Sequence, residues 1–497
     1  MTHRTSPLAA RIVTNPCWMT DLMRTRLLAV TLPLLLVPQS RGADPKLKQD
    51  AVAGVEQRAV KLTGLSDQIW ALAETALREN RSAALLAEYA EQQGFRVTRG
   101  VAGMPTAFVA EFGSGRPIIG ILGEYDALPG LSQKAVPQRE PLAAGVAGHG
   151  CCHNLFGVAS LGAAAAVKDL IASGKLKGTV RFYGTPAEES VGGKVYMARD
   201  GAFKDVDAML VWHPGDRIQS DNSSSQAIVD FVVEFRGKTA HAAFDPWNGR
   251  SASDASEAFV NGVNQLREHV RPSVRMHYVV QRAGDVPNVV PDYAKVWMWV
   301  RDSKGTGIEP VLARVRQIAE GAGLIASVES KLSIQAGDYE ILVNHAGARL
   351  LDRNLTWLGP ITYTAEEQEF ARTIQRAVGI AERGVVGEVQ PIRDPAPSAP
   401  EGGSTDVGDV SWLVPTINLT VTTGVWESPW HAWPVVATGG MSIGHKGMVY
   451  AAKALAITAV DLFVDPALRD AMRAEFTRQT QGFVYKPWIP AGPPPVP

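Results

Sequence analysis

The chain has 497 residues, of which 45% are hydrophobic, so it is long enough for two or three domains with substantial cores. Its 49 basic and 50 acidic residues give a formal net charge of −1, which argues against a nucleic-acid or anionic-membrane partner and favours a small substrate. Only three cysteines occur, and two of them, Cys151 and Cys152, are adjacent, which excludes a disulfide scaffold.

An apolar stretch near the N-terminus, Leu27 to Val37, follows Arg24 and Arg26. If translation starts at Met23, this segment resembles a secretory signal, and residues 1–43 form a leader. The stretch is too short to span a bilayer comfortably, and no later segment offers about 20 uninterrupted apolar residues. We therefore expect a periplasmic or secreted protein without a transmembrane span; the alternative is an uncleaved leader on a cytoplasmic protein.

Helices and strands are predicted in alternation after the leader. From Pro45 to Gln93, apolar residues spaced three and four apart predict helices. The segments that follow are expected to be strands over 107–112 and 117–123, a helix over 155–172, a strand over 178–183, a helix over 194–201 and a strand over 208–212. This alternation predicts an α/β sheet, in which ligands gather just beyond the carboxyl ends of the strands.

The pattern changes near Ser223, which predicts an inserted domain. Residues 226–235 alternate between apolar and polar, and helical segments over 252–269 and 308–322 flank a strand over 294–301. A βαβ-type insert of about 110 residues fits the usual size of a domain. The expected organisation is an α/β domain in two parts, 44–224 and 343–470, an inserted α+β domain, 225–342, and a proline-rich tail, 471–497.

Soft and borderline metal ligands begin in the run GHGCCHN, residues 148–154, and continue at Glu188, Glu189, His213 and His431. Cysteine thiolate, imidazole and carboxylate are the three ligand types that zinc-like ions take from proteins. The first three of these motifs lie near the ends of predicted strands, where side chains distant in sequence can converge. Each residue alone could be a buried structural group or a solvated acid, but the combination indicates metal-dependent hydrolysis.

The two adjacent carboxylates, Glu188 and Glu189, follow a predicted strand on a turn. Neighbouring side chains on a turn cannot both point the same way, so one can bind metal while the other faces the reacting water. A glutamate beside a metal-bound water can take its proton and later deliver it to a leaving amine.

Six motifs follow one another along the chain: GEYDALPG (123–130), GHGCCHN (148–154), GTPAEE (184–189), GKTAHAA (237–243), STDVGDVSW (404–412) and GGMSIGHKGM (439–448). In this order they resemble the M20 family of metallo-amidohydrolases and peptidases, and the resemblance covers about residues 50 to 465. It is strongest to the branch that contains the aminobenzoyl-glutamate hydrolase B subunits and aminoacylase-like amidohydrolases. The resemblance implies a two-domain α/β enzyme whose inserted domain serves as a lid and as a dimerisation surface.

The resemblance also implies roles for the metal-site residues. It makes Glu188 the general base and implies two divalent ions, either zinc or manganese or cobalt. The implied metal ligands are Cys151, His153, Glu189, His213 and His431. The family usually has glycine between the cysteine and the histidine, whereas this chain has Cys152, so either thiol could be the ligand. The one-residue gap favours Cys151, because Cys152 and His153 would project differently along the chain.

Further residues receive roles from the same resemblance. Asp126 would support the metal site by orienting a ligand imidazole, whereas Glu124 stands where other branches have a ligand histidine and is left unassigned. His241 would reach the active site of a neighbouring subunit and stabilise the oxyanion, which implies a homodimer. Asn288 and Arg301 resemble lid positions that bind a substrate carboxylate, although Arg301 could instead form a surface ion pair.

Three other histidines, His149, His277 and His445, are assigned to structure or to support of the site. The implied function is hydrolysis of the amide bond of an N-acyl or N-aroyl amino acid, such as an aminobenzoyl-glutamate-like compound, by attack of metal-bound water. One alternative is a dipeptidase or carboxypeptidase with the same machinery. Another is a binding subunit that has lost its chemistry, against which stands the complete set of metal-site residues.

Overall fold

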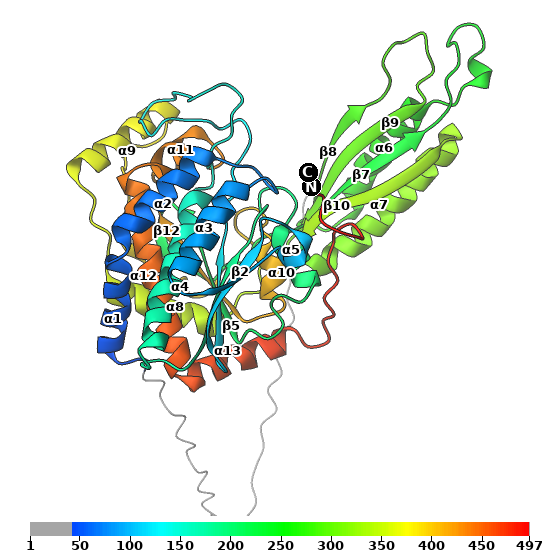
Figure 1. Ribbon diagram of the computed structural model, residues 1–497. Helices are drawn as coiled ribbons and strands as arrows, with labels where there is room; N and C mark the ends of the chain where they lie inside the picture. The colour runs from blue at the N-terminus through cyan, green and yellow to red at the C-terminus, as the bar shows by residue number, and fades with distance from the viewer. Residues whose placement is uncertain (1–41, 497) are drawn as a thin grey trace, which may run out of the picture. The chain divides into compact units, whose positions relative to one another are not determined.

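The computed structural model describes residues 42–496 (Figure 1). The apolar stretch on which the export prediction rests, Leu27 to Val37, lies outside these residues. Three helices come first, as the apolar spacing predicts: α1 (Pro45–Glu56), α2 (Ala59–Leu72) and α3 (Asn80–Gln92). Asp44 caps α1 by accepting the backbone N–H of Lys46, and Pro45 stands at the first helical position, where no N–H partner is needed.

A large sheet forms the centre of the α/β part, with the strand order β1-β2-β4-β3-β5-β12-β6-β11. Its strands are β1 (Arg96–Arg99), β2 (Phe108–Ser114), β3 (Ile118–Gly123), β4 (Gly178–Gly184), β5 (Ala208–Gly215), β6 (Ile218–Asp221), β11 (Val389–Gln390) and β12 (Thr416–Thr422). The middle strands β4, β3, β5 and β12 run parallel, so their carboxyl ends meet at one edge. Strand β12 lies between β5 and β6, although the inserted domain separates it from them in sequence.

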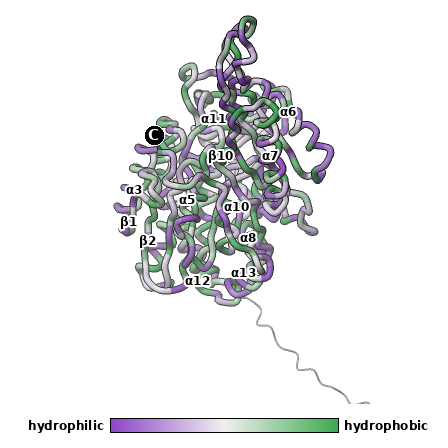
Figure 2. Tube along the Cα trace, turned by 90° about the vertical axis from the view of Figure 1, so that its right-hand side faces the viewer, coloured by the Kyte–Doolittle hydropathy of each residue, from purple (hydrophilic) through white to green (hydrophobic). Residues whose placement is uncertain are grey.

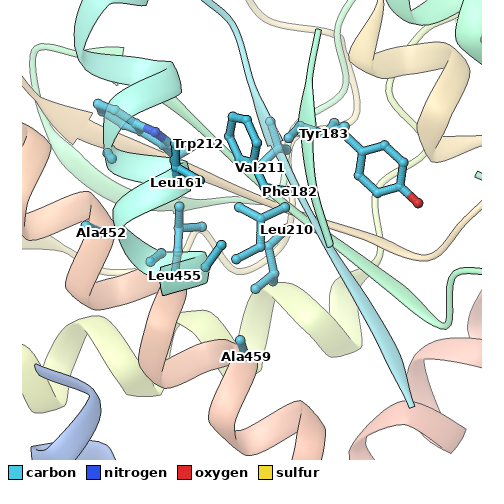
Figure 3. Close-up of a cluster of buried hydrophobic side chains, with 14 of the residues drawn as sticks. Leu161, Phe182, Tyr183, Leu210, Val211, Trp212, Ala452, Leu455 and Ala459 are labelled. Carbon is cyan, nitrogen blue, oxygen red and sulfur yellow. The ribbon is translucent and has the colours of Figure 1, made fainter. Parts of the chain in front are cut away.

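Two long helices, α4 (His153–Ala172) and α12 (Ser442–Val464), pack against each other and against this sheet. Figure 3 shows Leu161 of α4 and Leu455 of α12 beside Phe182 and Leu210 of the sheet. Within residues 42–496, α4 and α12 are also long and apolar enough to cross a membrane by length and composition alone. Most of their residues are buried inside the protein, as in core helices.

The remaining helices of the α/β part are α5 (Gly193–Arg199), α8 (His345–Leu358), α9 (Ala365–Val378), α10 (Val407–Ser411), α11 (Trp433–Gly439) and α13 (Pro466–Gln479). Helix α13 lies at the lower edge of the molecule in Figure 2, where hydrophilic residues are prominent, and buries only Leu468 and Met472. Residue 471, at which the proline-rich tail was expected to begin, therefore lies within a helix.

The inserted residues build a second sheet with the order β10-β7-β9-β8. Its strands are β7 (Ala227–Arg236), β8 (Arg275–Arg282), β9 (Tyr293–Asp302) and β10 (Glu329–Asp338), and one face is covered by α6 (Ala252–Leu266) and α7 (Gly305–Ala326) (Figure 1). All three neighbouring pairings of this sheet are antiparallel. The chain order β7-α6-β8-β9-α7-β10 nevertheless contains two βαβ units, in each of which one other strand lies between the two parallel strands, so these elements agree with the expected βαβ-type, α+β insert.

Alternation along β9 gives the second sheet two chemically different faces. Met298 and Val300 are buried against the helices, whereas Trp297, Trp299 and Arg301 lie on the opposite face. The polar and aromatic face is therefore available to a ligand.

The last residues of the chain pack against the junction of the two sheets. Trp488 stacks on Tyr339 at 4.3 Å between ring centroids and donates its indole N–H to Glu309 of α7. Phe483 packs on Trp412, which directly follows α10, with ring centroids 4.2 Å apart. The segment after α13 is extended, as expected from its prolines, and it contacts both the inserted domain and the α/β part.

Candidate metal centre

The GHGCCHN loop turns at Cys152, a residue in the left-handed region, so that Cys151 and His153 face the same site. Cys152, which precedes α4, has φ 55° and ψ 34°, so the backbone turns sharply between Cys151 and His153. The Cys152 thiol points into the core, where it contacts the carbonyl oxygen of Val435 at 3.3 Å. Gly439 leaves room for it, because a Cβ there would lie 2.9 Å from the sulfur. The structure thus directs the two adjacent thiols to different environments.

His153 is held in a defined orientation by Asp126. Its Nδ1 lies 2.9 Å from Asp126 Oδ1, and the other Asp126 oxygen accepts the backbone N–H of Glu189 at 2.9 Å. Burial acts to raise the pKa of Asp126, but the hydrogen bond and charge of His153, the backbone N–H of Glu189 and the charge of Lys194 together lower the pKa below its usual value. A carboxylate on Nδ1 leaves Nε2 of the same ring for a metal.

Side chains that can bind metal form overlapping groups around this point. In each group the candidate ligand atoms lie within 4.8 Å of one another. The groups are Glu124 with His153 and His213, Cys151 with Glu189 and His431, His153 with Glu188 and Glu189, and Glu124 with Glu188 and Asp406. The five residues expected as ligands are therefore all brought together, and Glu124 and Asp406 join them.

Three buried polar atoms in this cluster have no hydrogen-bond partner among the residues that the structure describes. They are Glu124 Oε2, His153 Nε2 and Glu189 Oε1. Glu124 Oε2 lies 3.0 Å from His153 Nε2 and 3.7 Å from His213 Nε2, without the geometry of a hydrogen bond. Buried polar groups nearly always have a hydrogen-bond partner. Unpartnered imidazole and carboxylate atoms that converge beside a thiol therefore fit a bound divalent cation.

The turn that carries Glu188 and Glu189 follows β4 and contains Ala187 in the left-handed region, with φ 61°. The buried Glu79 accepts the backbone N–H of Ala187 at 2.9 Å and so fixes this turn. Burial, followed by the charges of Glu124 and Glu189, raises the pKa of Glu188 well above its usual value. Burial also raises the pKa of Glu189, to about 7. A site this acidic needs bound cations for its carboxylates to be ionised together.

A buried lysine lies behind the candidate ligands. Lys194, at the start of α5, is fully buried, and its Nζ lies 2.6 Å from Glu124 Oε1 and 2.6 Å from Asp406 Oδ1. Burial acts to lower the pKa of Lys194, but the charges of Asp406 and Glu124 raise it far above its usual value. The lysine therefore stays charged and leaves only Glu124 Oε2 to face the imidazoles.

Sequence reasoning assigned no role to three of these supporting residues: Glu79, Lys194 and Asp406. Asp406 lies inside the STDVGDVSW motif, which could have drawn attention to it. Lys194 is a charged residue within an otherwise apolar, fully buried helix segment, and Glu79 lies at the start of a helix without any motif.

The metal-binding cluster opens into a cavity of about 950 Å³. One wall comes from the ends of β5, β6 and β12, and another from the polar face of the second sheet, including Trp297, Trp299 and Arg301. Arg301 donates to Ser404 Oγ at 2.8 Å and stacks over Trp299, and no carboxylate lies within 4.0 Å of it among residues 42–496. Burial lowers its pKa. An unpaired guanidinium in a cavity can pair with a ligand carboxylate.

Two other predicted site residues lie together elsewhere on the inserted domain. The backbone N–H of Ala242 donates to Asn288 O at 3.0 Å, so His241 and Asn288 are neighbours although far apart in sequence. Both are exposed, and neither lines the cavity. His241 Nδ1 accepts the N–H groups of Ala243 and Phe244, which places the ring proton on the exposed Nε2.

The three histidines that were assigned to structure or to support of the site lie outside the groups of candidate ligands. His149 is buried, with Nε2 3.0 Å from the carbonyl oxygen of Ile69. His445 contacts Asp67 at 2.8 Å, and His277 is exposed on β8.

The fold and the site define a hydrolase with a divalent-metal centre. Residues 120–422 match the model of peptidase family M20/M25/M40, which covers more than half of the chain. The chain belongs to this family and acts on amide bonds.

Curated relatives cover nearly the whole chain. It is 38% identical to the B subunit of the p-aminobenzoyl-glutamate hydrolase of Escherichia coli (strain K12), over 90% of this chain and 98% of that protein. It is 29% identical to the Xaa-Arg dipeptidase of Mus musculus, over 88% of this chain and 93% of that protein.

Solved structures share the fold. A dinuclear metal-binding peptidase of the M20 family from Bacillus subtilis has a TM-score of 0.55 at 18% identity, over 82% of this chain and 99% of that chain. An aminobenzoyl-glutamate utilization protein from Klebsiella pneumoniae has a TM-score of 0.54 at 19% identity, over 81% of this chain and 97% of that chain.

The two adjacent thiols provide a matched pair of variants. Loss of a residue that only hydrogen-bonds to a metal ligand usually weakens metal binding about 10- to 100-fold. Cys151→Ser removes a proposed ligand itself, so we expect it to weaken metal binding by more than that. Cys152→Ser is expected to keep the wild-type metal content, because its side chain points away from the cluster and serine can still contact Val435 O. Metal content and chelator competition measure both. Retained metal in Cys151→Ser would refute the assignment.

Proposed function

We propose that the chain hydrolyses the amide bond of N-acyl or N-aroyl amino acids, and that its substrate is an aminobenzoyl-glutamate-like compound. The observation that carries the proposal is one cavity that joins the metal-binding cluster to the unpaired guanidinium of Arg301 and the indoles of Trp297 and Trp299. The cluster would hold the amide, the guanidinium would bind the carboxylate of the amino acid, and the indoles would face an apolar acyl group. The relatives named for aminobenzoyl-glutamate and for dipeptides agree with this substrate class.

Two divalent ions, zinc or else manganese or cobalt, are proposed for the cluster. One would be held in the group of Glu124, His153 and His213, and the other in the group of Cys151, Glu189 and His431. Such ions polarise a scissile carbonyl and lower the pKa of water.

The residues of the chain supply the proton transfer and the orientation. Glu188 is placed beside both candidate ion positions, so its carboxylate can take a proton from the attacking water and deliver it to the leaving amine. The raised pKa of Glu188 suits this exchange, because a base must also act as an acid later in the reaction. Asp126 keeps both His153 and the backbone of Glu189 in place during the reaction.

A substrate panel with chelated enzyme tests the proposal. The full chain, stripped of metal by a chelator, is expected to lose activity on N-acyl and N-aroyl amino acids and to recover it when zinc, manganese or cobalt is added back. Dipeptides of matched size form the comparison. Cleavage of dipeptides alone would replace the proposal with a dipeptidase, and activity indifferent to chelation would overturn the mechanism. Metal-loaded protein without any activity would indicate a binding subunit.

A homodimer formed through the inserted domain is proposed as the active form. His241 presents an Nε2 donor to solvent on a domain that also exposes Phe244 and Trp247, which are 78% and 72% accessible. A second copy of the chain would cover such apolar groups and receive the donor in its own site, where it would stabilise the oxyanion. Sedimentation of the full chain tests this; a monomer at micromolar concentration would contradict it.

Export to the periplasm or the medium remains a proposal that rests on the apolar stretch after Arg26. N-terminal sequencing of secreted protein tests it. A leader that starts at Met23 and is cleaved supports the proposal, whereas an intact Met1 on the mature protein would contradict it.

A further inference from the structure

The end of the cavity away from the metal-binding cluster contains a carboxylate, that of Asp221, which has no basic side chain within 4.0 Å among residues 42–496. Asp221 ends β6, and β12 separates β6 from β5, which carries His213. In the sheet His213 is opposite Thr420, and Asn418 of the same strand is opposite Asp221. Two strand spacings of about 4.8 Å across the sheet and two residues of about 3.3 Å along β12 therefore put Asp221 roughly 12 Å from His213. This separation matches the distance from a scissile amide to the far end of a small substrate.

One of the two Asp221 carboxylate oxygens, Oδ2, accepts a hydrogen bond from a side chain of the protein. The Thr420 hydroxyl donates to Oδ2 at 2.6 Å, while Oδ1 has no partner in the part of the chain that the structure describes. Burial raises the pKa of Asp221 to about 6, with the Thr420 hydrogen bond acting against it. The charges of Arg393 and Arg217 also act against burial, so at neutral pH the group is mostly ionised, although no basic side chain among the described residues forms an ion pair with it.

The two arginines nearest to this end of the cavity are already paired with other carboxylates. Arg217 Nε lies 2.9 Å from Asp216 Oδ1, and its guanidinium stacks over Trp426. Arg393 forms an ion pair with Glu401. The charges of both arginines still act on Asp221 from a distance, partly offset by that of Glu401, but neither guanidinium lies within 4.0 Å of its carboxylate among the described residues. Asp221 Oδ1 is therefore left to accept a hydrogen bond from a donor group of a ligand, which favours such a group over an anionic one.

The opposite wall of the cavity could pack against the part of a ligand that bears the donor group, whether this part is an aromatic ring or an aliphatic chain. Trp297 and Trp299 form an edge-to-face pair with centroids 5.8 Å apart. Asp230 accepts the Trp297 indole N–H at 2.6 Å, which fixes the ring. Indole faces pack well against aromatic rings and against the stems of cationic side chains.

We propose that Asp221 recognises an amino group that the substrate carries at the far end of the cavity from the metal-binding cluster. The inference rests on the proposed amide hydrolysis and narrows its substrate class. The amino group has two possible sources, an aromatic amine on the acyl ring or the side-chain ammonium of the leaving amino acid. In both cases it would donate to Asp221 Oδ1, and a carboxylate in its place would be rejected.

Two pairs of substrates test this with the metal-loaded full chain. N-(4-aminobenzoyl)-L-glutamate against N-benzoyl-L-glutamate tests the acyl source, and N-benzoyl-L-lysine against N-benzoyl-L-norleucine tests the leaving-group source. In at least one of the two pairs, the wild type is expected to have a kcat/KM about 10- to 100-fold higher for the substrate with the amino group, the usual effect of a hydrogen bond to a charged group. Asp221→Asn should remove most of that ratio.

Glu401→Gln is the control for charge, because it removes one negative charge from the lining of the same cavity and leaves both oxygens of Asp221 in place. It should leave the ratio close to that of the wild type. Equal loss of the ratio in both variants would overturn the proposal, since a general negative potential would then explain it. An unchanged ratio in Asp221→Asn, with wild-type metal content and unfolding midpoint, would also overturn it, as would equal cleavage within both wild-type pairs. If none of the four substrates is cleaved, the proposed function fails, and this inference with it.

Discussion

Glu188→Gln is expected to lower turnover about 10²- to 10⁴-fold while metal content stays at the wild-type level. The amide keeps the size of the side chain and its place beside the cluster but cannot accept the proton of the attacking water. The carboxyl also shares its surroundings with Glu124, Glu189 and Asp406, so removing one negative charge does not weaken the remaining ligands by repulsion. Turnover on a cleaved N-acyl amino acid and metal analysis of the same preparation measure the two effects.

The neighbouring carboxylate is the control for this experiment. Glu189→Gln alters a group whose Oε1 is an orphan atom in the cluster and whose Oε2 lies 3.5 Å from His431 Nε2. We expect this variant to lose metal together with activity. If Glu188→Gln also loses metal in proportion to activity, Glu188 is a ligand and not the base.

Lys194→Met is expected to destabilise the protein by about 3–5 kcal/mol, the usual cost of breaking a buried ion pair. The substitution leaves Glu124 Oε1 and Asp406 Oδ1 without the lysine that they share, and both of these side chains are fully buried. It also frees Glu124 Oε1, so metal affinity should change along with stability. Urea unfolding followed by tryptophan fluorescence, and chelator competition, measure the two quantities.

A surface lysine supplies the comparison for Lys194. Lys175 lies 2.7 Å from Asp50, but its side chain is 50% exposed, so Lys175→Met should cost at most about 1 kcal/mol. The double variant Lys194→Met with Asp406→Asn should recover part of the lost stability, because it removes one of the two unpaired charges. Equal midpoints for Lys194→Met and Lys175→Met would show that the buried lysine does not stabilise the site.

The elements with clear periodicity could be predicted from the sequence, and those with a polar, cavity-facing side could not. Helix α4 and strands β3 to β5 match the expected segments within a few residues, because they are apolar on all sides or have a clear helical period. Strand β12, with the sequence TINLTVT, places Asn418 and Thr420 toward the cavity and was not recognised, although it is a central strand. Strands β6 and β11 are too short to produce a pattern.

In the candidate site, too, some residues could be predicted from the sequence and others could not. The expected ligands were found through thiol, imidazole and carboxylate motifs, and the structure brings them together. The residues that hold them could not be found in this way, because the roles of Glu79 and Lys194 arise from tertiary contacts with segments far away in sequence. Similarly, the different directions of Cys151 and Cys152 depend on a single left-handed residue, which residue spacing alone does not reveal.

The position of β12 has a consequence for synthesis of the chain. Strands β5 and β6 emerge from the ribosome roughly 200 residues before β12, and in the native sheet β12 lies between them. Until then, β5 has an unpaired edge next to a run of apolar residues, which is a template for aggregation. The inserted domain has its own core and can fold during this interval. We therefore expect chains that stop before residue 416 to aggregate during expression, and the complete chain to benefit from slow synthesis or from a chaperone.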